Sequence, residues 1–371
     1  MRPEKRIPAL HTALLCICSS ALAVWIYLIA FRGGFWRVSF GRAPVSFGSS
    51  KSVCVVIPAR DEEATIGQAV ASLRPWPVIV VDDHSSDRTA ELARAAGAEV
   101  IAAAPLPPGW SGKLWALSQG LDHAASRKPD YFLLTDADIV HSPTNVGELV
   151  ARAEDQNLDL ASLMVKLRCR STAEKLLIPA FVFFFFMLYP PAWVARRNRR
   201  TAAAAGGCIL IRPTALARIG GIAAIKHEII DDCALARAVK RSGGNIWMGL
   251  TPDTESIRDY TSFAEIRAMI SRTAFAQLQH SALLLAGTIV SMAILYLAPP
   301  VFALIGNPIA IAAWMLMSLS YIPMLRFYGR SPALAPLLPL IALFYMFATF
   351  ESAIAYWTGR GGAWKGRHQD T

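Results

Sequence analysis

Long uncharged stretches at both ends of the chain predict helices that cross a membrane. Residues 7–31, 273–325 and 331–350 contain no charged side chain. About 20 apolar residues, each adding about 1.5 Å of helix, cross the hydrocarbon core of a bilayer. The pattern therefore predicts four spanning helices, at residues 8–31, 281–299, 306–325 and 333–357. The alternative for the first is a cleaved signal peptide, although its uncharged stretch is long for one.

From about residue 52 the pattern changes to short apolar runs that alternate with amphipathic stretches. Four runs are typical of buried strands: SVCVVIPA, VIVVDD, AEVIAAA and YFLLTDAD. Three stretches between them have helical spacing of apolar residues: DEEATIGQAVASL, SSDRTAELARAAG and GKLWALSQGLDHAA. This βαβαβαβ order predicts an α/β domain with a mostly parallel sheet covered by helices.

Acidic side chains follow three of the four predicted strands, at the edge where α/β sheets bind their ligands. They are Asp61 and Glu62 after the first strand, Asp82 and Asp83 after the second, and Asp136 and Asp138 after the fourth. So many like charges repel one another unless a cation lies among them. Side chains two apart on an extended segment point to the same side, so Asp136 and Asp138 with a diphosphate can complete the oxygen shell of Mg²⁺ or Mn²⁺.

Each of these residues also has an ordinary structural interpretation. Asp61 can be a helix N-cap, Asp82 and Asp83 can form a turn, and a chain of this length contains about one Asp-x-Asp by chance. Lys113, which with Gly112 opens the third helix, can contact a diphosphate or lie on a solvated face. The joint occurrence of the carboxylates at the ends of successive strands favours the metal site.

Composition supports a membrane protein. Hydrophobic residues make up 54% of the chain and charged residues only 17%, which excludes intrinsic disorder and disfavours an ordinary soluble enzyme. The net charge of +10 suits anionic partners, and the apolar runs favour a membrane over nucleic acid. The six cysteines form no metal-type pair and fit a reducing compartment. No GxGxxG follows a strand, which disfavours a dinucleotide-dependent oxidoreductase.

Residues 176–195, LLIPAFVFFFFMLYPPAWVA, form an uncharged stretch inside the α/β region. If it crossed the membrane, Asp138 and Asp232 would lie on opposite sides, which a single active site forbids. We therefore expect an interfacial or re-entrant element. Four arginines follow it, at 196, 197, 199 and 200, and favour an anionic lipid surface. The alternative is a buried aromatic core helix with a solvated basic turn.

Charge in the loops predicts the orientation only in part. The loop with Arg326 and Arg330 should be cytoplasmic, which also places the middle region in the cytoplasm. Four spanning helices would then put the basic tail outside, against the positive-inside rule, so whether one helix is re-entrant stays open. The expected divisions are an anchor at 1–32, the α/β domain at 50–275 with its interfacial element, helices at 280–358 and a basic tail at 359–371.

Several strings of the middle region resemble the family 2 glycosyltransferases with the GT-A fold. They are VVIPARDEEATI, VVDDHSSDRTAELA, GKLWALSQG and LLTDAD, followed by GGCILIRPTALARIGG and EIIDDCALARAVKRSG, which resemble the family's acceptor-side segment. The resemblance covers roughly residues 52–275. With the flanking apolar helices, the string PLPPGWSGKLWALSQG is most similar to the hopene-associated (HpnB-like) membrane glycosyltransferases.

The resemblance implies a role for each matching residue. The implied nucleotide-sugar-binding residues are Pro58, Arg60, Glu62, Asp82, Asp83, Lys113, Asp136 and Arg272. Asp136 and Asp138 are the implied metal ligands. Asp232 is the implied catalytic base that takes the acceptor proton, and Asp231 supports it. Without the resemblance, Asp231 and Asp232 are explained equally well as acidic residues at a helix N-terminus.

The resemblance also implies the reaction. Processive members carry Gln-x-x-Arg-Trp where this chain has residues 269–273, MISRT, which implies a single sugar transfer. The expected protein is an inverting, Mg²⁺- or Mn²⁺-dependent glycosyltransferase that uses a nucleotide sugar, expected to be UDP-linked. The implied acceptor is a hopanoid or polyisoprenoid lipid, and the implied location is the inner membrane, multi-pass, with a cytoplasmic catalytic domain. The alternatives are a membrane nucleotidyltransferase with the same carboxylates and a non-catalytic nucleotide-binding transporter or scaffold.

Overall fold

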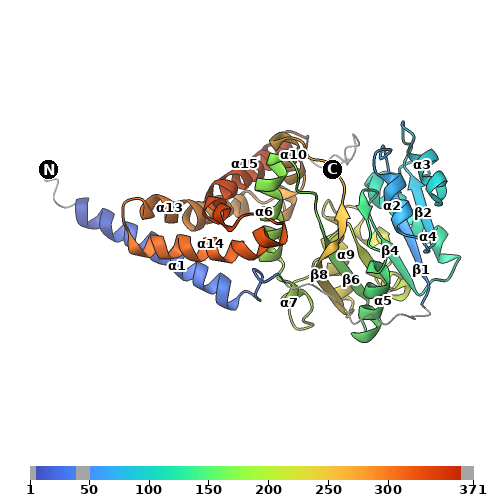
Figure 1. Ribbon diagram of the computed structural model, residues 1–371, viewed down its shortest axis with the longest axis horizontal. Coiled ribbons are helices and arrows are strands. Elements are labelled where there is room, and N and C mark those ends of the chain that lie inside the picture. Colours follow the sequence, from blue (N-terminus) through green and yellow to red (C-terminus); the bar gives the residue numbers. More distant parts are fainter. Residues whose placement is uncertain (1–5, 39–50, 361–371) are drawn as a thin grey trace. The chain divides into compact units, whose positions relative to one another are not determined.

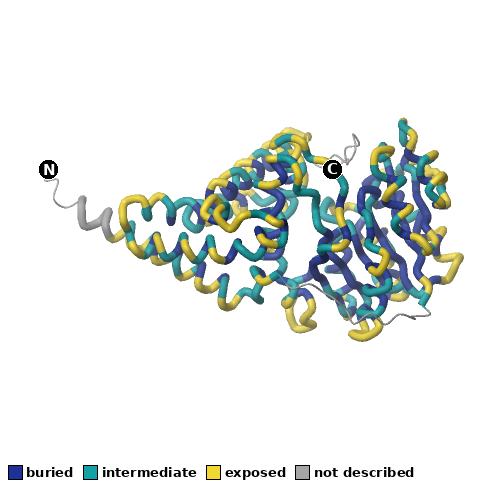
Figure 2. The backbone as a smooth tube through the Cα atoms, in the orientation of Figure 1, coloured by how far each residue is buried: buried dark blue, intermediate teal, exposed yellow. Residues whose placement is uncertain are grey.

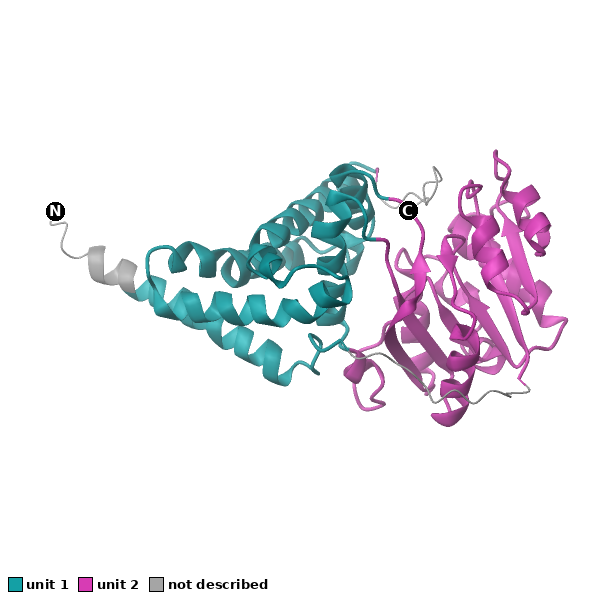
Figure 3. Cartoon of the chain, in the orientation of Figure 1, with its two compact units in different colours: residues 1–38, 169–190, 260–359 teal, residues 39–168, 191–259, 360–371 magenta. Residues whose placement is uncertain are grey.

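The computed structural model describes residues 6–38 and 51–360 and divides them into two compact units (Figure 3). The sheet unit contains residues 51–168 and 191–259. The helical unit contains residues 6–38, 169–190 and 260–359. The stretch at 176–195 expected within the α/β domain therefore falls mostly in the helical unit.

An eight-stranded sheet in the order β3-β2-β1-β4-β7-β6-β8-β5 forms the centre of the sheet unit (Figure 1). The strands are β1 (Val53–Ala59), β2 (Val78–Asp82), β3 (Glu99–Ala102), β4 (Tyr131–Leu134), β5 (Ile139–Val140), β6 (Leu160–Lys166), β7 (Ile209–Ile211) and β8 (Ile246–Ser256). The four strands expected from the sequence are β1 to β4, and all their mutual pairings are parallel. β7 runs antiparallel to β4 and β6, and β5 runs antiparallel to β8, so the whole sheet is mixed.

Burial explains why these strands form. Every residue of β1 and β4 is buried, as expected of central strands covered on both faces. Figure 2 shows most of the sheet in the colour of buried residues. Gly120 permits close packing of a helix on this sheet, because a Cβ there would lie 2.5 Å from Val56 Cγ1 and 2.7 Å from Val81 Cγ2.

The three helices expected between these strands are present. The helices of the sheet unit are α2 (Ile66–Ser72), α3 (Thr89–Ala96), α4 (Gly112–Ala125), α5 (Asn145–Asp155), α7 (Pro191–Val194), α8 (Pro213–Arg218), the 3₁₀ helix η2 (Ile222–Ile225) and α9 (Asp231–Arg241). Ser111 caps α4 by accepting a hydrogen bond from Leu114 N. Asp61 is not a helix N-cap: its carboxylate accepts a hydrogen bond of 2.7 Å from Ser86 N in the loop after β2.

The helical unit contains the apolar segments. Its elements are α1 (Arg6–Phe31), α6 (Thr172–Leu188), α10 (Phe263–Ser271), α11 (Ala274–Gln277), α12 (Ala282–Met292), the π turn η3 (Ala293–Leu297), α13 (Ala298–Ala303), α14 (Pro308–Phe327), the 3₁₀ helix η4 (Pro332–Leu337) and α15 (Leu338–Trp357). By length and composition, five segments of the described chain are apolar enough to cross a membrane: Thr12–Phe31, Thr172–Val194, Ala282–Ala303, Pro308–Phe327 and Pro332–Trp357. Four of them correspond to the helices expected from the sequence.

The helix expected at 281–299 begins at Ala282 and continues past Pro299-Pro300. It runs through the π turn η3 and α13 to Ala303, and the π turn lies directly before the two prolines. The break before α14 comes at Asn307, whose side chain accepts hydrogen bonds from the first backbone amides of α14.

α6, which contains most of the uncharged stretch at 176–195, is packed inside the helical unit. Phe183 lies 5.2 Å from the ring of Tyr321 in α14, and Phe184 lies 5.0 Å from the ring of Tyr345 in α15. Tyr345 also donates a hydrogen bond of 3.0 Å to Leu177 O. In Figure 1, α6 runs across the ends of α1 and α14 instead of alongside them. Phe183 and Phe186 are buried, whereas Phe181, Phe184 and Phe185 are partly exposed, so this helix is half buried within the unit.

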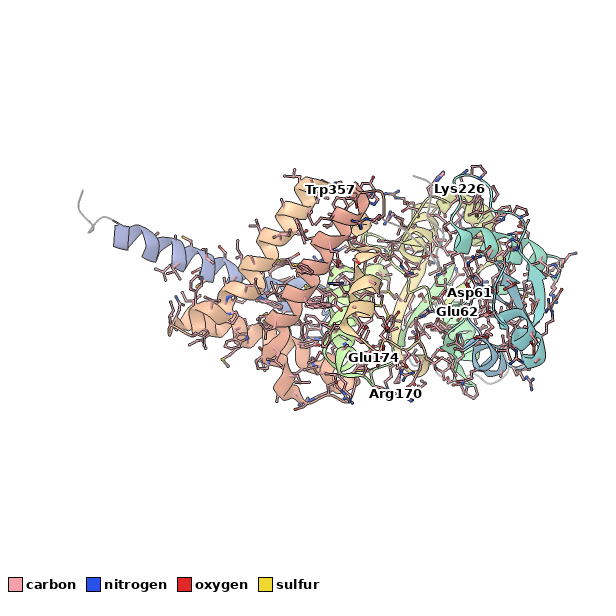
Figure 4. The ribbon with its side chains drawn as sticks, turned by 90° about the horizontal axis from the view of Figure 1, so that it is seen from above. Asp61, Glu62, Arg170, Glu174, Lys226 and Trp357 are labelled. Atoms are coloured by element: carbon pink, nitrogen blue, oxygen red, sulfur yellow. The ribbon has the colours of Figure 1, made fainter. Side chains whose placement is uncertain are left out.

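Contacts within the helical unit also fix the course of α15. Trp314, near the middle of α14, donates a hydrogen bond to Pro336 O, so the chain turns back along α14 before α15 begins. At the other end of α15, which Figure 4 marks by Trp357, the ring of Trp357 lies 5.4 Å from the ring of Phe275 in α11. Glu351 pairs with Arg267 of α10 at 3.2 Å, which accounts for the one acidic residue in this helix.

Candidate active site

Three separate segments of the sheet unit bring acidic and basic side chains to one place, and two more segments complete its lining. Lys113, at the start of α4, lies 3.0 Å through its Nζ from Asp136 Oδ1 and 3.3 Å from Asp231 Oδ2. Asp232, at the start of α9, accepts a hydrogen bond of 2.9 Å from Gly206 N. These residues and Pro58, at the end of β1, line one pocket. The structure therefore brings together residues from every resemblance string except the second.

Burial and charge set the protonation of this group. Burial is the largest effect on the Asp232 carboxyl, and with the nearby charge of Asp231 it raises the pKa of Asp232 to about 6. Burial also raises the pKa of Asp136, against the opposing effect of Lys113. For Lys113, burial favours the neutral amine, but the carboxylates of Asp136 and Asp231 outweigh it and raise the pKa of the ammonium. Lys113 is a permanent cation here, and Asp232 is a carboxylate that can accept a proton near neutral pH.

Asp138 lies in a second cluster, which reaches back to the loop after β1. Asp138 Oδ2 accepts a hydrogen bond of 2.6 Å from Ser256 Oγ and lies 3.4 Å from Arg258 Nε. Arg258 Nη2 lies 2.6 Å from Glu62 Oε1, so one guanidinium joins the carboxylates of Asp138 and Glu62 (Figure 4 labels Glu62). Sequence reasoning missed Ser256 and Arg258, because only the pairing of β8 with β5 brings them beside Asp138.

A third group surrounds the ends of β1 and β2. Arg60 Nη1 donates a hydrogen bond of 2.5 Å to Asp83 O and lies 3.7 Å from Asp83 Oδ2, and Asp83 is almost completely buried. Asp82 follows the same strand, and its buried Oδ1 atom has no hydrogen-bond partner among the described residues. Arg272, which ends α10, belongs to the helical unit, so its predicted contact with the diphosphate stays a prediction.

The carboxylates fit a divalent metal that binds together with a diphosphate. Within residues 6–38 and 51–360, no group of three or more His, Cys, Asp or Glu side chains could hold a metal ion. Asp136 and Asp138 are instead two oxygen donors, each now paired with a cationic side chain, Lys113 or Arg258. Mg²⁺ is commonly bound by one or two carboxylates plus substrate phosphates. The protein therefore offers part of the coordination shell, and the phosphates of a ligand would complete it.

Comparisons with known proteins show similarity to glycosyltransferases. Residues 54–220 match the model of the family named Glycosyl transferase family 2. Over 94 residues the chain is 39% identical to the 4,4'-diaponeurosporenoate glycosyltransferase of Staphylococcus aureus (strain bovine RF122 / ET3-1), and the match covers 24% of each protein. The USA300 strain has a similar enzyme that is 38% identical over the same length. The chain thus spans about a quarter of the curated relatives it matches.

Two solved structures of glycosyltransferases are similar to this chain to different extents. The mannosyltransferase PcManGT from Pyrobaculum calidifontis, in complex with GDP-Man and Mn²⁺, is 16% identical with a TM-score of 0.51 over 92% of this chain and 99% of that one. Glucosyl-3-phosphoglycerate synthase from Mycobacterium tuberculosis, in complex with Mg²⁺ and UDP, is 20% identical with a TM-score of 0.43 over 62% of this chain and 79% of that one. The mixed α/β fold is GT-A-like, and residues 54–220 are a Glycosyl transferase family 2 domain.

Proposed function

We propose that this protein is an inverting, divalent-metal-dependent glycosyltransferase that moves one sugar from a nucleotide sugar to a lipid hydroxyl. The observation that carries this proposal is the position of Asp232. It is a carboxylate with a pKa raised to about 6, in one pocket with Lys113 and Asp136. A base and a diphosphate-binding cation side by side are what transfer from a nucleotide sugar to a hydroxyl requires. The family 2 domain at residues 54–220 supports the same reaction.

The residues of the pocket divide the chemistry among them. Asp232 accepts the proton of the acceptor hydroxyl as it attacks the anomeric carbon, and the N–H groups of Gly206 and Cys233 orient its two oxygens. Attack from the side opposite the leaving diphosphate inverts the anomeric centre. The positive charge of Lys113 stabilises the negative charge of the departing diphosphate. A metal held at Asp136 and Asp138 would supply Lewis-acid stabilisation of the same leaving group.

The donor and the metal are proposed from the same residues. PcManGT, which shares the fold, was solved with GDP-Man and Mn²⁺. Arg60, Asp82 and Asp83 surround the end of β2, beyond which a nucleoside binds in sheets of this kind. We propose UDP-sugars as the first donors to test, and Glu62 and Arg272 as further donor contacts.

A donor screen tests the proposed function directly. Purified full-length protein in lipid nanodiscs is incubated with Mg²⁺ or Mn²⁺, a panel of UDP- and GDP-sugars, and a lipid extract rich in hopanoids and polyisoprenoid alcohols. We expect release of nucleoside diphosphate together with a glycosylated lipid. Release of pyrophosphate instead would identify a nucleotidyltransferase, and no consumption of any donor would contradict both enzyme functions.

The proposal of a lipid acceptor rests on the helical unit. Its five apolar segments place lipid within reach of the chain, and the S. aureus relative is named for a reaction on 4,4'-diaponeurosporenoate. Arg196, Arg197, Arg199 and Arg200 are exposed after α7, in keeping with contact to anionic lipid. We propose an inner-membrane, multi-pass protein with its catalytic domain in the cytoplasm, and a hopanoid or polyisoprenoid lipid as acceptor.

We also propose that η4 and α15 form a re-entrant hairpin, which would place the C-terminal end of α15 in the cytoplasm. The chain returns from the sheet unit immediately before α10, so a cytoplasmic catalytic domain requires α10 at that face. Glu351 and Trp357 of α15 contact α10 and Phe275. The basic residues that follow α15 would then obey the positive-inside rule.

Reporter fusions test this orientation. We expect green fluorescent protein fused after Thr358 to fluoresce, and alkaline phosphatase fused there to be inactive, because the phosphatase needs the oxidising periplasm. The matched control is fusion in the loop before α14, at Gly306, where the two reporters should give the opposite result. Active phosphatase at Thr358 would show that α15 crosses the membrane.

A further inference from the structure

A chain of buried polar side chains lies behind the pocket, and the chemistry described above does not use it. Thr135, His141 and Asn145 are 2%, 4% and 3% exposed. His141 Nε2 lies 2.9 Å from Thr135 Oγ1, and His141 Nδ1 lies 2.9 Å from Asn145 Nδ2. Thr135 Oγ1 in turn donates a hydrogen bond of 2.8 Å to Gly207 O. Polar groups this deeply buried cost free energy unless they are paired, so a continuous chain of them calls for an explanation.

The donor and acceptor properties of these groups fix the direction of each hydrogen bond in the chain. An amide nitrogen only donates, so Asn145 Nδ2 donates to His141 Nδ1, which must carry no proton. Burial lowers the pKa of His141 to about 4, so the ring is neutral and its single proton sits on Nε2. Nε2 therefore donates to Thr135 Oγ1, and the hydroxyl proton of Thr135 is left for Gly207 O. The hydrogen bonds of the chain thus all point the same way, from Asn145 to the glycine loop, and Asn145 Nδ2 also donates to Cys208 Sγ at 3.7 Å.

The last hydrogen bond of this chain, from Thr135 to Gly207, joins the immediate neighbours of two active-site residues. Thr135 directly precedes Asp136, the carboxylate that faces Lys113. Gly207 directly follows Gly206, whose N–H donates to Asp232. The polar chain thus connects the donor-side carboxylate to the amide that holds the proposed base.

The glycine loop has little freedom of its own. A Cβ on Gly207 would lie 3.2 Å from Ile139 Cδ1 and 3.3 Å from Val165 Cγ2, so the loop packs closely on strands β5 and β6. Ser162 Oγ, which is fully buried, accepts a hydrogen bond of 2.8 Å from Ala205 N. The hydrogen bond from Thr135 to Gly207 O further fixes this loop, at the residue that follows Gly206, whose N–H donates to Asp232.

We propose that His141 is a positioning residue: through Thr135 and Gly207 it fixes the Gly206 amide that orients Asp232, and so keeps the base aligned with the donor-side carboxylate. The inference rests on the proposed transfer reaction for its catalytic consequence. The structural link itself is independent of that reaction. His141 touches neither donor nor acceptor in this account, so its effect must appear in the chemical step and not in donor binding.

The test compares His141→Phe with His141→Gln in the full-length protein. Phenylalanine keeps the ring but removes both hydrogen bonds, whereas the glutamine amide can accept from Asn145 and donate to Thr135. We expect His141→Phe to lower kcat by about 10- to 100-fold with a donor KM within about twofold of wild type, since misalignment of about 1 Å costs rate at this scale. His141→Gln should restore most of the rate. Unchanged kcat in His141→Phe, or an equal loss in both variants, overturns the proposal.

Hydrogen exchange separates this proposal from the proposed function. In His141→Phe, we expect peptides that cover residues 204–208 to exchange at least about threefold faster, while peptides from β1 keep the wild-type rate. This comparison needs no substrate, so it decides the link even if wild-type protein releases no nucleoside diphosphate. Wild-type exchange at 204–208 overturns the link. If His141→Phe does not fold, the same comparison is made at Thr135, the next residue of the hydrogen-bonded chain. Thr135→Val removes the hydroxyl, and Thr135→Ser, which keeps it, is the control.

Discussion

Replacing Asp232 by asparagine should lower the rate of sugar transfer by about 10²- to 10⁴-fold, the contribution that a positioned general base makes. Asparagine has the same shape, and its amide oxygen can still accept the hydrogen bond from Gly206 N. It cannot take the proton of the acceptor hydroxyl. The loss should therefore fall on kcat, measured as release of nucleoside diphosphate, with the donor KM little changed.

The pH dependence of transfer by the wild-type enzyme tests the same assignment of Asp232 as the base. The Asp232 carboxyl has a pKa raised from its ordinary value to about 6, first by burial and then by the charge of Asp231. Only the deprotonated form can act as the base. Transfer should fall about tenfold for each pH unit below 6 and level off above it, and Asp232→Asn should remove this acid limb.

Asp253→Asn is the matched control, because Asp253 is an exposed acid on β8, in the sheet unit but outside the pocket. It should transfer sugar at the wild-type rate. If Asp232→Asn were as active as this control, another group would be the base. If neither the wild-type protein nor either variant released nucleoside diphosphate, the non-catalytic scaffold would be the better account.

The parts of the site that the sequence predicts are those set by local pattern. Buried parallel strands show as continuous apolar runs, so β1, β2 and β4 could be placed, and their ends carry Glu62, Asp83 and Asp138 to one edge. Lys113 could be placed because it opens a helix directly after a serine cap. The resemblance then added Asp232, which no local pattern distinguishes from an ordinary helix N-terminus.

The rest depends on contacts between residues far apart in the chain. Ser256 and Arg258 reach Asp138 only because β8 pairs with β5, and nothing in the string around residue 256 indicates that pairing. The return of α15 toward α10 depends in the same way on the pair between Glu351 and Arg267. A hydropathy pattern gives the length of such a helix and cannot say where its ends lie.

Removing the metal should abolish transfer, and Asp138→Ala should reproduce that loss by at least about 100-fold, because the diphosphate then leaves without charge neutralisation. EDTA should stop the wild-type reaction, and excess Mg²⁺ or Mn²⁺ should restore it. In Asp138→Ala, added metal should restore little, since one of two protein ligands is gone. Asp122→Ala, which alters an exposed acid of α4, is the control and should respond to EDTA and metal as wild type does.

The number of protein ligands also predicts how tightly the metal binds, and this affinity can be measured without any sugar transfer. Because Asp136 and Asp138 supply only part of the shell, Mn²⁺ should bind weakly to the protein alone and at least about tenfold more tightly with UDP present. Electron paramagnetic resonance of free Mn²⁺ measures both affinities. The UDP effect should disappear in Asp138→Ala, because the metal would then lose one of its two proposed protein ligands. Tight Mn²⁺ binding without UDP would show that other side chains complete the site.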